Sequence, residues 1–112
     1  MPSSYGVNFN DVRHNADTYV PFQLDGTDIT GGVFRMSLQN RQRIVVKTFT
    51  IGDGIEVVDA LTGKFAFSLP HTAASLLPVG VYLHDLLYES PAGKVDRIWR
   101  GSMTVRAGIT AP

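Results

Sequence analysis

Hydrophobic and polar residues alternate with a period of two along much of the chain. From Phe34 to Leu38 every second residue is large and apolar, and the segment Phe65–Leu69 repeats this pattern. Successive side chains of a strand point to opposite faces of a sheet, so both segments predict strands with one buried face. The segment Ile44–Ile51 is instead rich in β-branched residues, which predicts a buried strand.

Turn segments separate the predicted strands at short intervals. Glycine, asparagine and aspartate concentrate in them, because these residues tolerate the backbone conformations that turns require. The number and spacing of the strands, about seven, are typical of a β-sandwich. We therefore predict an all-β fold, an antiparallel β-sandwich. The predicted turns are Asp25–Asp28, Asn40–Gln42, Gly52–Gly54, Thr62–Lys64 and Ser90–Gly93.

The first part of the chain is polar and holds few residues suited to a core. Such a segment buries too little apolar surface to offset the entropy lost on ordering. We therefore predict a flexible N-terminal arm over residues 1–16, with a short strand at Tyr5–Phe9, followed by a β-sandwich domain over residues 17–112. In an assembly the arm would lie on a neighbouring molecule, and its partner-binding anchors would be Tyr5, Val7 and Phe9.

Two further elements are limited by proline. The segment Thr18–Leu24 has the composition of a strand, but Pro21 cannot donate to a ladder, which predicts an edge strand. The segment His71–Leu77 is the helical candidate, with Thr72 as a plausible N-cap. Pro78 ends this predicted helix.

Composition narrows the possible partners. The chain of 112 residues is 44% hydrophobic, enough for the core of one domain, and it contains no cysteine for a disulfide framework or a thiolate metal site. Ten basic residues balance ten acidic ones, which argues against nucleic acid as the main partner, because phosphate binding needs a basic excess or patch. No apolar run approaches the length of a membrane span, and Met1–Ser4 lacks the features of a secretory signal. We expect a soluble protein made in the cytosol.

His84 and Asp85 form the pair that most suggests catalysis. Adjacent strand residues point to opposite faces, so the two cannot share one site, and the chain has no nucleophile motif to complete a dyad. His14, His71 and His84 lack the spacing of a metal cluster, and Asp25–Asp28 does not match the twelve-residue calcium loop. We therefore predict no catalytic residues, no metal and no cofactor: the protein is not an enzyme.

Trp99 is the single tryptophan, and the strand around it has no cleanly apolar face. Large aromatic side chains are usually buried in their own domain, which favours a core position. Tryptophan and arginine are also enriched at the energetic centres of interfaces. The candidate partner-binding residues on this strand are therefore Arg97, Trp99 and Arg100, and an exposed sheet edge is a second candidate surface.

The last third of the chain carries a distinctive series of residues: Leu77-Pro78, Gly80, Tyr82, Asp85, a turn at Gly93, then Gly101 and a final Ile109-Thr110. A tyrosine where the chain crosses between sheets can bury its ring and donate its hydroxyl to a loop backbone group. We also expect an aspartate there to accept a hydrogen bond from a neighbouring turn. The predicted structural residues are Pro78, Gly80, Tyr82, Asp85, Gly93 and Gly101.

This series resembles the Ig-like modules of small structural proteins in tailed bacteriophages, which occur in tail, baseplate and fibre-anchoring proteins. The resemblance covers most of the chain and is firmest over Phe65–Thr110. It implies an Ig-like β-sandwich with one short helix before the penultimate strand. In larger members the module continues beyond the final Ile-Thr pair, so the end of this chain at Pro112 favours a free-standing small virion protein over a fibre anchor.

The resemblance implies a non-enzymatic virion protein, made in the host cytoplasm and present in several copies per particle. One hypothesis is an adaptor or accessory component of the tail, tail tip or baseplate that binds other virion proteins. A second is a head decoration protein that cements capsomers. A third is a carbohydrate-binding module for host adhesion, which usually needs exposed aromatic side chains at one site. Neither nucleic acid nor membrane is expected as a partner.

Overall fold

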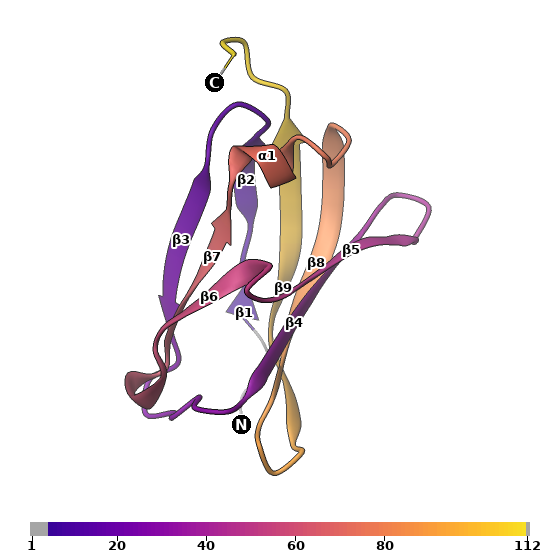
Figure 1. Ribbon diagram of the computed structural model, residues 1–112. Helices are drawn as coiled ribbons and strands as arrows, with labels where there is room; N and C mark the ends of the chain where they lie inside the picture. The colour runs from indigo at the N-terminus through magenta and orange to yellow at the C-terminus, as the bar shows by residue number, and fades with distance from the viewer. Residues whose placement is uncertain (1–4, 112) are drawn as a thin grey trace.

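The computed structural model describes residues 5–111 and consists almost entirely of β-strands (Figure 1). The predicted all-β class is confirmed, including the short helix before the penultimate strand. That helix is α1 (His71–Ala74), and a 3-10 turn, η1 (Ala60–Thr62), precedes β7. The strands are β1 (Tyr5–Gly6), β2 (Phe9–Arg13), β3 (Thr18–Gln23), β4 (Val33–Gln39), β5 (Val45–Ile51), β6 (Gly54–Asp59), β7 (Lys64–Leu69), β8 (Gly80–Glu89) and β9 (Val95–Arg106).

The nine described strands form one sheet in the order β1-β9-β8-β4-β5-β6-β7-β3, with β2 also paired to β9. The sheet curls until its two ends approach each other. Phe9 of β2 and Phe22 of β3 have ring centroids 6.2 Å apart, although no ladder joins these two strands. The sheet is thus nearly closed into a barrel. It differs in detail from the predicted antiparallel sandwich of about seven strands, because the pairs β1–β9, β2–β9 and β5–β6 are parallel.

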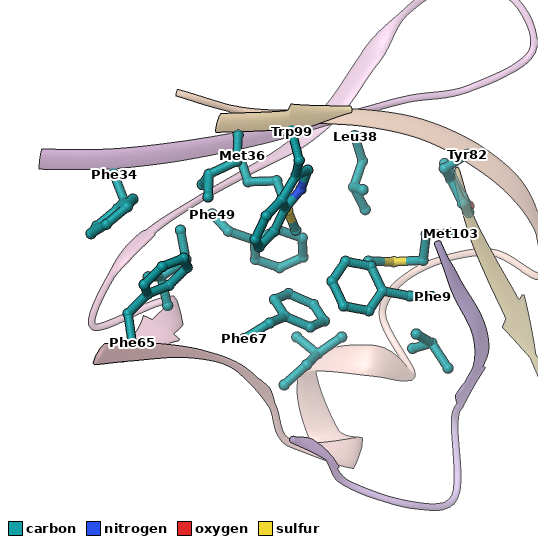
Figure 2. Packing of buried hydrophobic residues seen from close by; sticks show 14 of the residues in the cluster. Phe9, Phe34, Met36, Leu38, Phe49, Phe65, Phe67, Tyr82, Trp99 and Met103 are labelled. Atoms are coloured by element: carbon teal, nitrogen blue, oxygen red, sulfur yellow. The ribbon is translucent and has the colours of Figure 1, made fainter. Parts of the chain in front are cut away.

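Aromatic side chains fill the interior of this curled sheet (Figure 2). Phe34 stacks on Phe65 with ring centroids 4.7 Å apart, and Phe22 lies 4.4 Å from Trp99. Alternate residues of β4 and β8 point inward, as period-two patterning predicts. The largest side chains with almost no exposure are Phe34, Met36, Leu38, Phe49, Phe65, Phe67, Leu69, Leu86 and Met103.

The N-terminal segment differs from the predicted flexible arm. Tyr5–Gly6 and Phe9–Arg13 both pair in parallel with β9. Phe9 and Val12 are buried in the core. The prediction is wrong for this part of the chain because the edge of β9 supplies the backbone hydrogen bonds that the segment alone lacks. Residues 1–4 of the predicted arm lie outside the described residues.

A bulge in β9 explains the irregular pattern around Trp99. Leu86 of β8 lies opposite Trp99, whereas Leu87 lies opposite Arg97, so Ile98 has no partner across the ladder. An extra residue of this kind changes which way the neighbouring side chains point. Ile98 and Trp99 are accordingly both buried, and Trp99 belongs to the core.

The structure contains both elements whose position or length we predict from a proline, but the predicted N-cap of the helix is wrong. β3, which holds Pro21, is the last strand in the sheet order, so the predicted edge position is confirmed. The helix α1 begins before Thr72, the predicted N-cap, and its N-cap is Pro70. Asp17 completes this end of the helix, because its Oδ1 accepts a hydrogen bond of 2.8 Å from the His71 backbone N–H. This bond is the main reason that the pKa of the Asp17 carboxyl lies below its usual value.

Tyr82 occupies the corner position that the sequence predicts. Its ring is buried, and its hydroxyl donates a hydrogen bond to the backbone carbonyl of Pro78. Burial raises the pKa of the hydroxyl, so it stays protonated as a donor. This bond ties the start of β8, at Gly80, to the connection that follows α1.

β9 and the N-terminal segment approach each other most closely at Gly101. A Cβ atom at this position would lie 1.7 Å from the Val7 carbonyl oxygen. Next to it, the Asn8 side-chain oxygen accepts hydrogen bonds from the Ser102 backbone N–H, at 3.0 Å, and from the Ser102 hydroxyl, at 3.2 Å. The missing side chain at Gly101 therefore lets the link between β1 and β2 lie against β9.

We predict that Gly101→Ala destabilises the protein by about 1–3 kcal/mol, because the added methyl group must displace the backbone at Val7. Gly6→Ala is the matched control, since a Cβ at Gly6 meets no atom within 4 Å. Urea denaturation of both variants and the wild type measures the difference. Equal stability of the two variants would contradict the close approach.

We also predict that Tyr82→Ala costs about 3–5 kcal/mol, because it removes a buried ring and leaves the Pro78 carbonyl without its donor. Tyr82→Phe keeps the ring and should cost only about 1 kcal/mol, the usual contribution of one hydrogen bond. Thermal denaturation separates the two effects. A wild-type melt for Tyr82→Ala would show that the ring contributes nothing to the core.

Candidate interaction surface

The outer face of β4, β5, β8 and β9 carries an open groove of about 850 Å³. Its floor is built from cross-strand neighbours. Gln39 of β4 lies between Val45 of β5 and Leu83 of β8, and Ser102 of β9 continues this row. The lining combines apolar and polar groups: Gly6, Val45, Leu83 and Gly101 lie beside Asn8, Ser37, Gln39, His84, Asp85, Arg97, Arg100 and Ser102.

The predicted partner-binding residues divide between this face and the core. Arg97 and Arg100 are exposed on β9 and border the groove. Phe9 and Trp99 are buried, at 5% and 3% exposure, so the prediction that they contact a partner is wrong. Val7 is half-buried and packs against the core. The side chain of Tyr5 lies outside the part of the chain that the structure describes. Among the described side chains, the two arginines are therefore the predicted residues that a partner could reach.

His84 and Asp85 point to opposite faces of β8, as their adjacency predicts. Asp85 is half-buried on the outer face, where it lies across the ladder from Arg100. The hydrogen bond that we predicted from a turn to Asp85 does not form within residues 5–111. His84 is buried on the inner face, with its ring centroid 5.2 Å from that of Phe9. Both residues border the groove of the outer face, but their side chains lie on opposite faces of β8.

The environment of His84 favours the neutral imidazole. His84 Nε2 lies 3.1 Å from the carbonyl oxygen of Ser102. A carbonyl oxygen can only accept, so Nε2 carries the hydrogen and Nδ1 is left as an acceptor. Nδ1 is buried and has no hydrogen-bond partner in the part of the chain that the structure describes. Burial lowers the pKa of His84, and this effect outweighs the opposing influence of Ser102 and Asp85.

The β4–β5 hairpin projects from the body of the sheet (Figure 1) and exposes apolar side chains. Ile44, Val45 and Val46 are 58%, 55% and 42% exposed. The segment Ile44–Ile51 thus differs from the buried strand that its sequence predicts. Within β5, the buried side chain is that of Phe49. The reason is that β4 flanks most of β5, whereas β6 pairs only with its last two residues. The first half of β5 therefore lies at a free edge.

A second groove, of about 300 Å³, lies between this hairpin and β8. Arg41 and Arg43 on its rim are exposed, and neither forms an ion pair within residues 5–111. We call Arg41, Arg43 and Ile44–Val46 the basic hairpin. Sequence analysis missed this surface, although two arginines followed directly by three β-branched residues were a signal for it. The groove is lined by Gln39, Asn40, Arg41, Arg43, Val81 and Leu83.

The turn of the basic hairpin places an arginine where glycine fits better. The Asn40 N–H bonds to the Ile44 carbonyl at 2.9 Å, and the Arg43 N–H bonds to the Asn40 carbonyl at 3.0 Å. The β8–β9 hairpin closes Ser90–Lys94 with the same two bonds. Its left-handed residue is Gly93, with φ of 92°, whereas Arg43 has φ of 64°. A residue with a side chain in this region costs roughly 1–2 kcal/mol.

Other features of the chain do not identify its function. Within residues 5–111 no three histidine, aspartate or glutamate side chains gather closely enough to hold a metal ion. Across the same range no helix has the length and apolarity needed to cross a membrane. Comparison with protein-family models finds no match to the chain, and comparison with curated proteins finds none either. The function must therefore be inferred from the surface of the protein itself.

The pKa of His84 gives a pH prediction. Because this pKa is lowered in the folded state, the unfolded chain binds a proton at higher pH than the folded chain does. Stability should be full above pH 6.5, the ordinary pKa of histidine, and should fall as the pH decreases from there toward the folded-state pKa. Urea denaturation between neutral and mildly acidic pH measures this slope. His84→Leu should flatten it, and an unchanged slope would assign the effect to other groups.

Proposed function

We propose that this protein is a non-enzymatic structural protein that acts by assembling with other proteins, as a tail, tail-tip or baseplate component of a tailed bacteriophage. The observation that carries the proposal is the basic hairpin. It presents three consecutive β-branched side chains to solvent on an element that projects from a well-packed body. Val45 lies in the same cross-strand row as Leu83, which is also exposed, and exposed apolar surface marks sites of protein–protein contact.

The surroundings of the basic hairpin support a protein partner. Val81 and Leu83 of β8, 42% and 58% exposed, extend the apolar surface beside the hairpin. Arg41 and Arg43 border it, and the groove of the outer face adjoins it through Gln39 and Leu83. Protein interfaces combine an apolar centre with a polar rim, and arginine is enriched in them.

The inner face offers no comparable place for chemistry. The large side chains of the core fill it, and His84 lies there against the ring of Phe9. A catalytic acid or base must come within hydrogen-bond distance of its substrate. His84 is 5% exposed although it borders the outer groove, so little of it can reach a substrate, which favours the non-enzymatic role.

The virion assignment comes from the resemblance to phage Ig-like modules. The residues that carry this resemblance have clear roles in the fold: Tyr82 holds the corner, Gly93 supplies the left-handed turn residue, and Gly101 allows a close backbone approach. A balanced net charge also suits a protein that works in an assembly, because it weakens repulsion between copies.

The test is to locate the protein in particles of the phage or prophage that encodes it. Particles are purified, tails are separated from heads, and the proteins of each fraction are identified by mass spectrometry. We expect the chain in the tail fraction, and we expect deletion of its gene to give particles with defective tails. Its presence in heads alone would favour the decoration hypothesis, and its absence from both fractions would overturn the proposal.

A further inference from the structure

The net charge of zero conceals a separation of charge between two ends of the molecule. The basic hairpin lies on one side of the protein, and the β3–β4 loop with η1 lies on the other (Figure 1). The loop and η1 are held together by two backbone hydrogen bonds of 2.9 Å, from Leu24 N–H to the Gly63 carbonyl and from Ile29 N–H to the Ala60 carbonyl. They therefore form one rigid surface.

That surface carries acidic side chains around exposed apolar ones. Asp25, Asp28 and Asp59 are all exposed. The Thr30 hydrogen bond keeps the pKa of Asp28 below its usual value, so this carboxylate stays charged. Leu61 of η1 is 74% exposed. We call Asp25, Asp28, Asp59 and Leu61 the acidic end.

The two surfaces complement each other in charge and in apolar character. Arg41 and Arg43 border a groove whose apolar lining is Val81 and Leu83. The acidic end offers three carboxylates and the exposed Leu61, beside one lysine, Lys64, which lies opposite Asp59 in the β6–β7 ladder. Opposite charges arranged around apolar contacts favour association and fix its register.

We infer that the basic hairpin of one molecule docks on the acidic end of a second copy, so that the molecules associate head to tail. The arginines then face the aspartates, and Leu61 enters the groove beside Leu83. A contact between two different surfaces of the same chain repeats from copy to copy and gives a ring or an open filament. The contact also gives a use for Arg43, whose left-handed backbone is a cost to the isolated fold.

This inference deepens the proposed function, because it names a partner within the assembly. It rests on that function only in placing the association in a virion. The association itself is a property of the purified protein. The two ideas can therefore fail separately.

Sedimentation velocity over a range of concentrations and salt tests the inference. The wild type should associate, and more weakly as salt rises, because salt screens exposed charges. The variant Arg41→Glu/Arg43→Glu should raise the dissociation constant at least about tenfold, since it sets like charges against each other. Asp25→Lys/Asp59→Lys should have the same effect. An equal mixture of the two variants should associate again, because each reversed surface then meets its opposite.

Matched controls separate this contact from general charge effects. The single variant Arg41→Glu is measured beside Lys94→Glu, which makes the same charge change on the β8–β9 hairpin, whose turn has the same backbone bonds. Arg41→Glu should weaken association. Lys94→Glu should leave association unchanged. Arg43→Gly should weaken association several-fold and raise the denaturation midpoint, because glycine relieves the left-handed backbone. Thermal melts of every variant confirm that each one is folded.

Several results would overturn the inference. They include a wild type that stays monomeric at all concentrations, reversed variants that each associate like the wild type, and a mixture that fails to recover association. If the hairpins instead paired with each other, the Asp25→Lys/Asp59→Lys variant would associate normally. A monomeric protein that is still found in tails would leave the proposed function standing without this contact.

Discussion

The structure depends on the contacts that the N-terminal segment makes, inside one curled sheet, with strands from later in the chain. Phe9, at the start of β2, lies against the rings of Phe22, Phe67, His84 and Trp99. These side chains come from strands that are far apart in the sheet order. Phe9 therefore fills the seam, which is the gap between β2 and β3 that no ladder joins. An unfilled seam would forfeit both dispersion contacts and apolar burial. The ladder between β2 and β9 holds Phe9 in place.

A filled interior leaves the outer surface as the place for function. The two grooves described above lie on the outside of β4, β5, β8 and β9, and a further groove lies beside β3, β6 and β7. In each case the strands fix the positions of the lining side chains. The two hairpins with equivalent turns differ in the residue at the left-handed position. Gly93 gives one turn its preferred residue, whereas Arg43 brings a charge to the other at the expense of backbone strain.

Features with a local signature could be predicted from the sequence, and features that depend on distant partners could not. Alternation predicted β4 and β7, and Pro21 predicted an edge strand, because these patterns reflect neighbours along the chain. The strand Phe9–Arg13 forms only because β9 lies beside it. Trp99 faces inward because of a bulge that no periodicity reveals. The apolar run Ile44–Val46 is exposed because β6 leaves β5 after two residues, so the interaction surface was missed.

The pairing of β2 with β9 has a consequence for biosynthesis. Asn8 and Ser102 are hydrogen-bonded although 94 residues separate them. The N-terminal segment is synthesised well before its partner strand, so this part of the sheet cannot form until β9 has left the ribosome. Until then the aromatic residues of the growing chain have no finished core to enter, and such non-local pairing is slow. A chain that ends before β9 lacks the strand that pairs with β1, β2 and β8, so none of these three ladders can form.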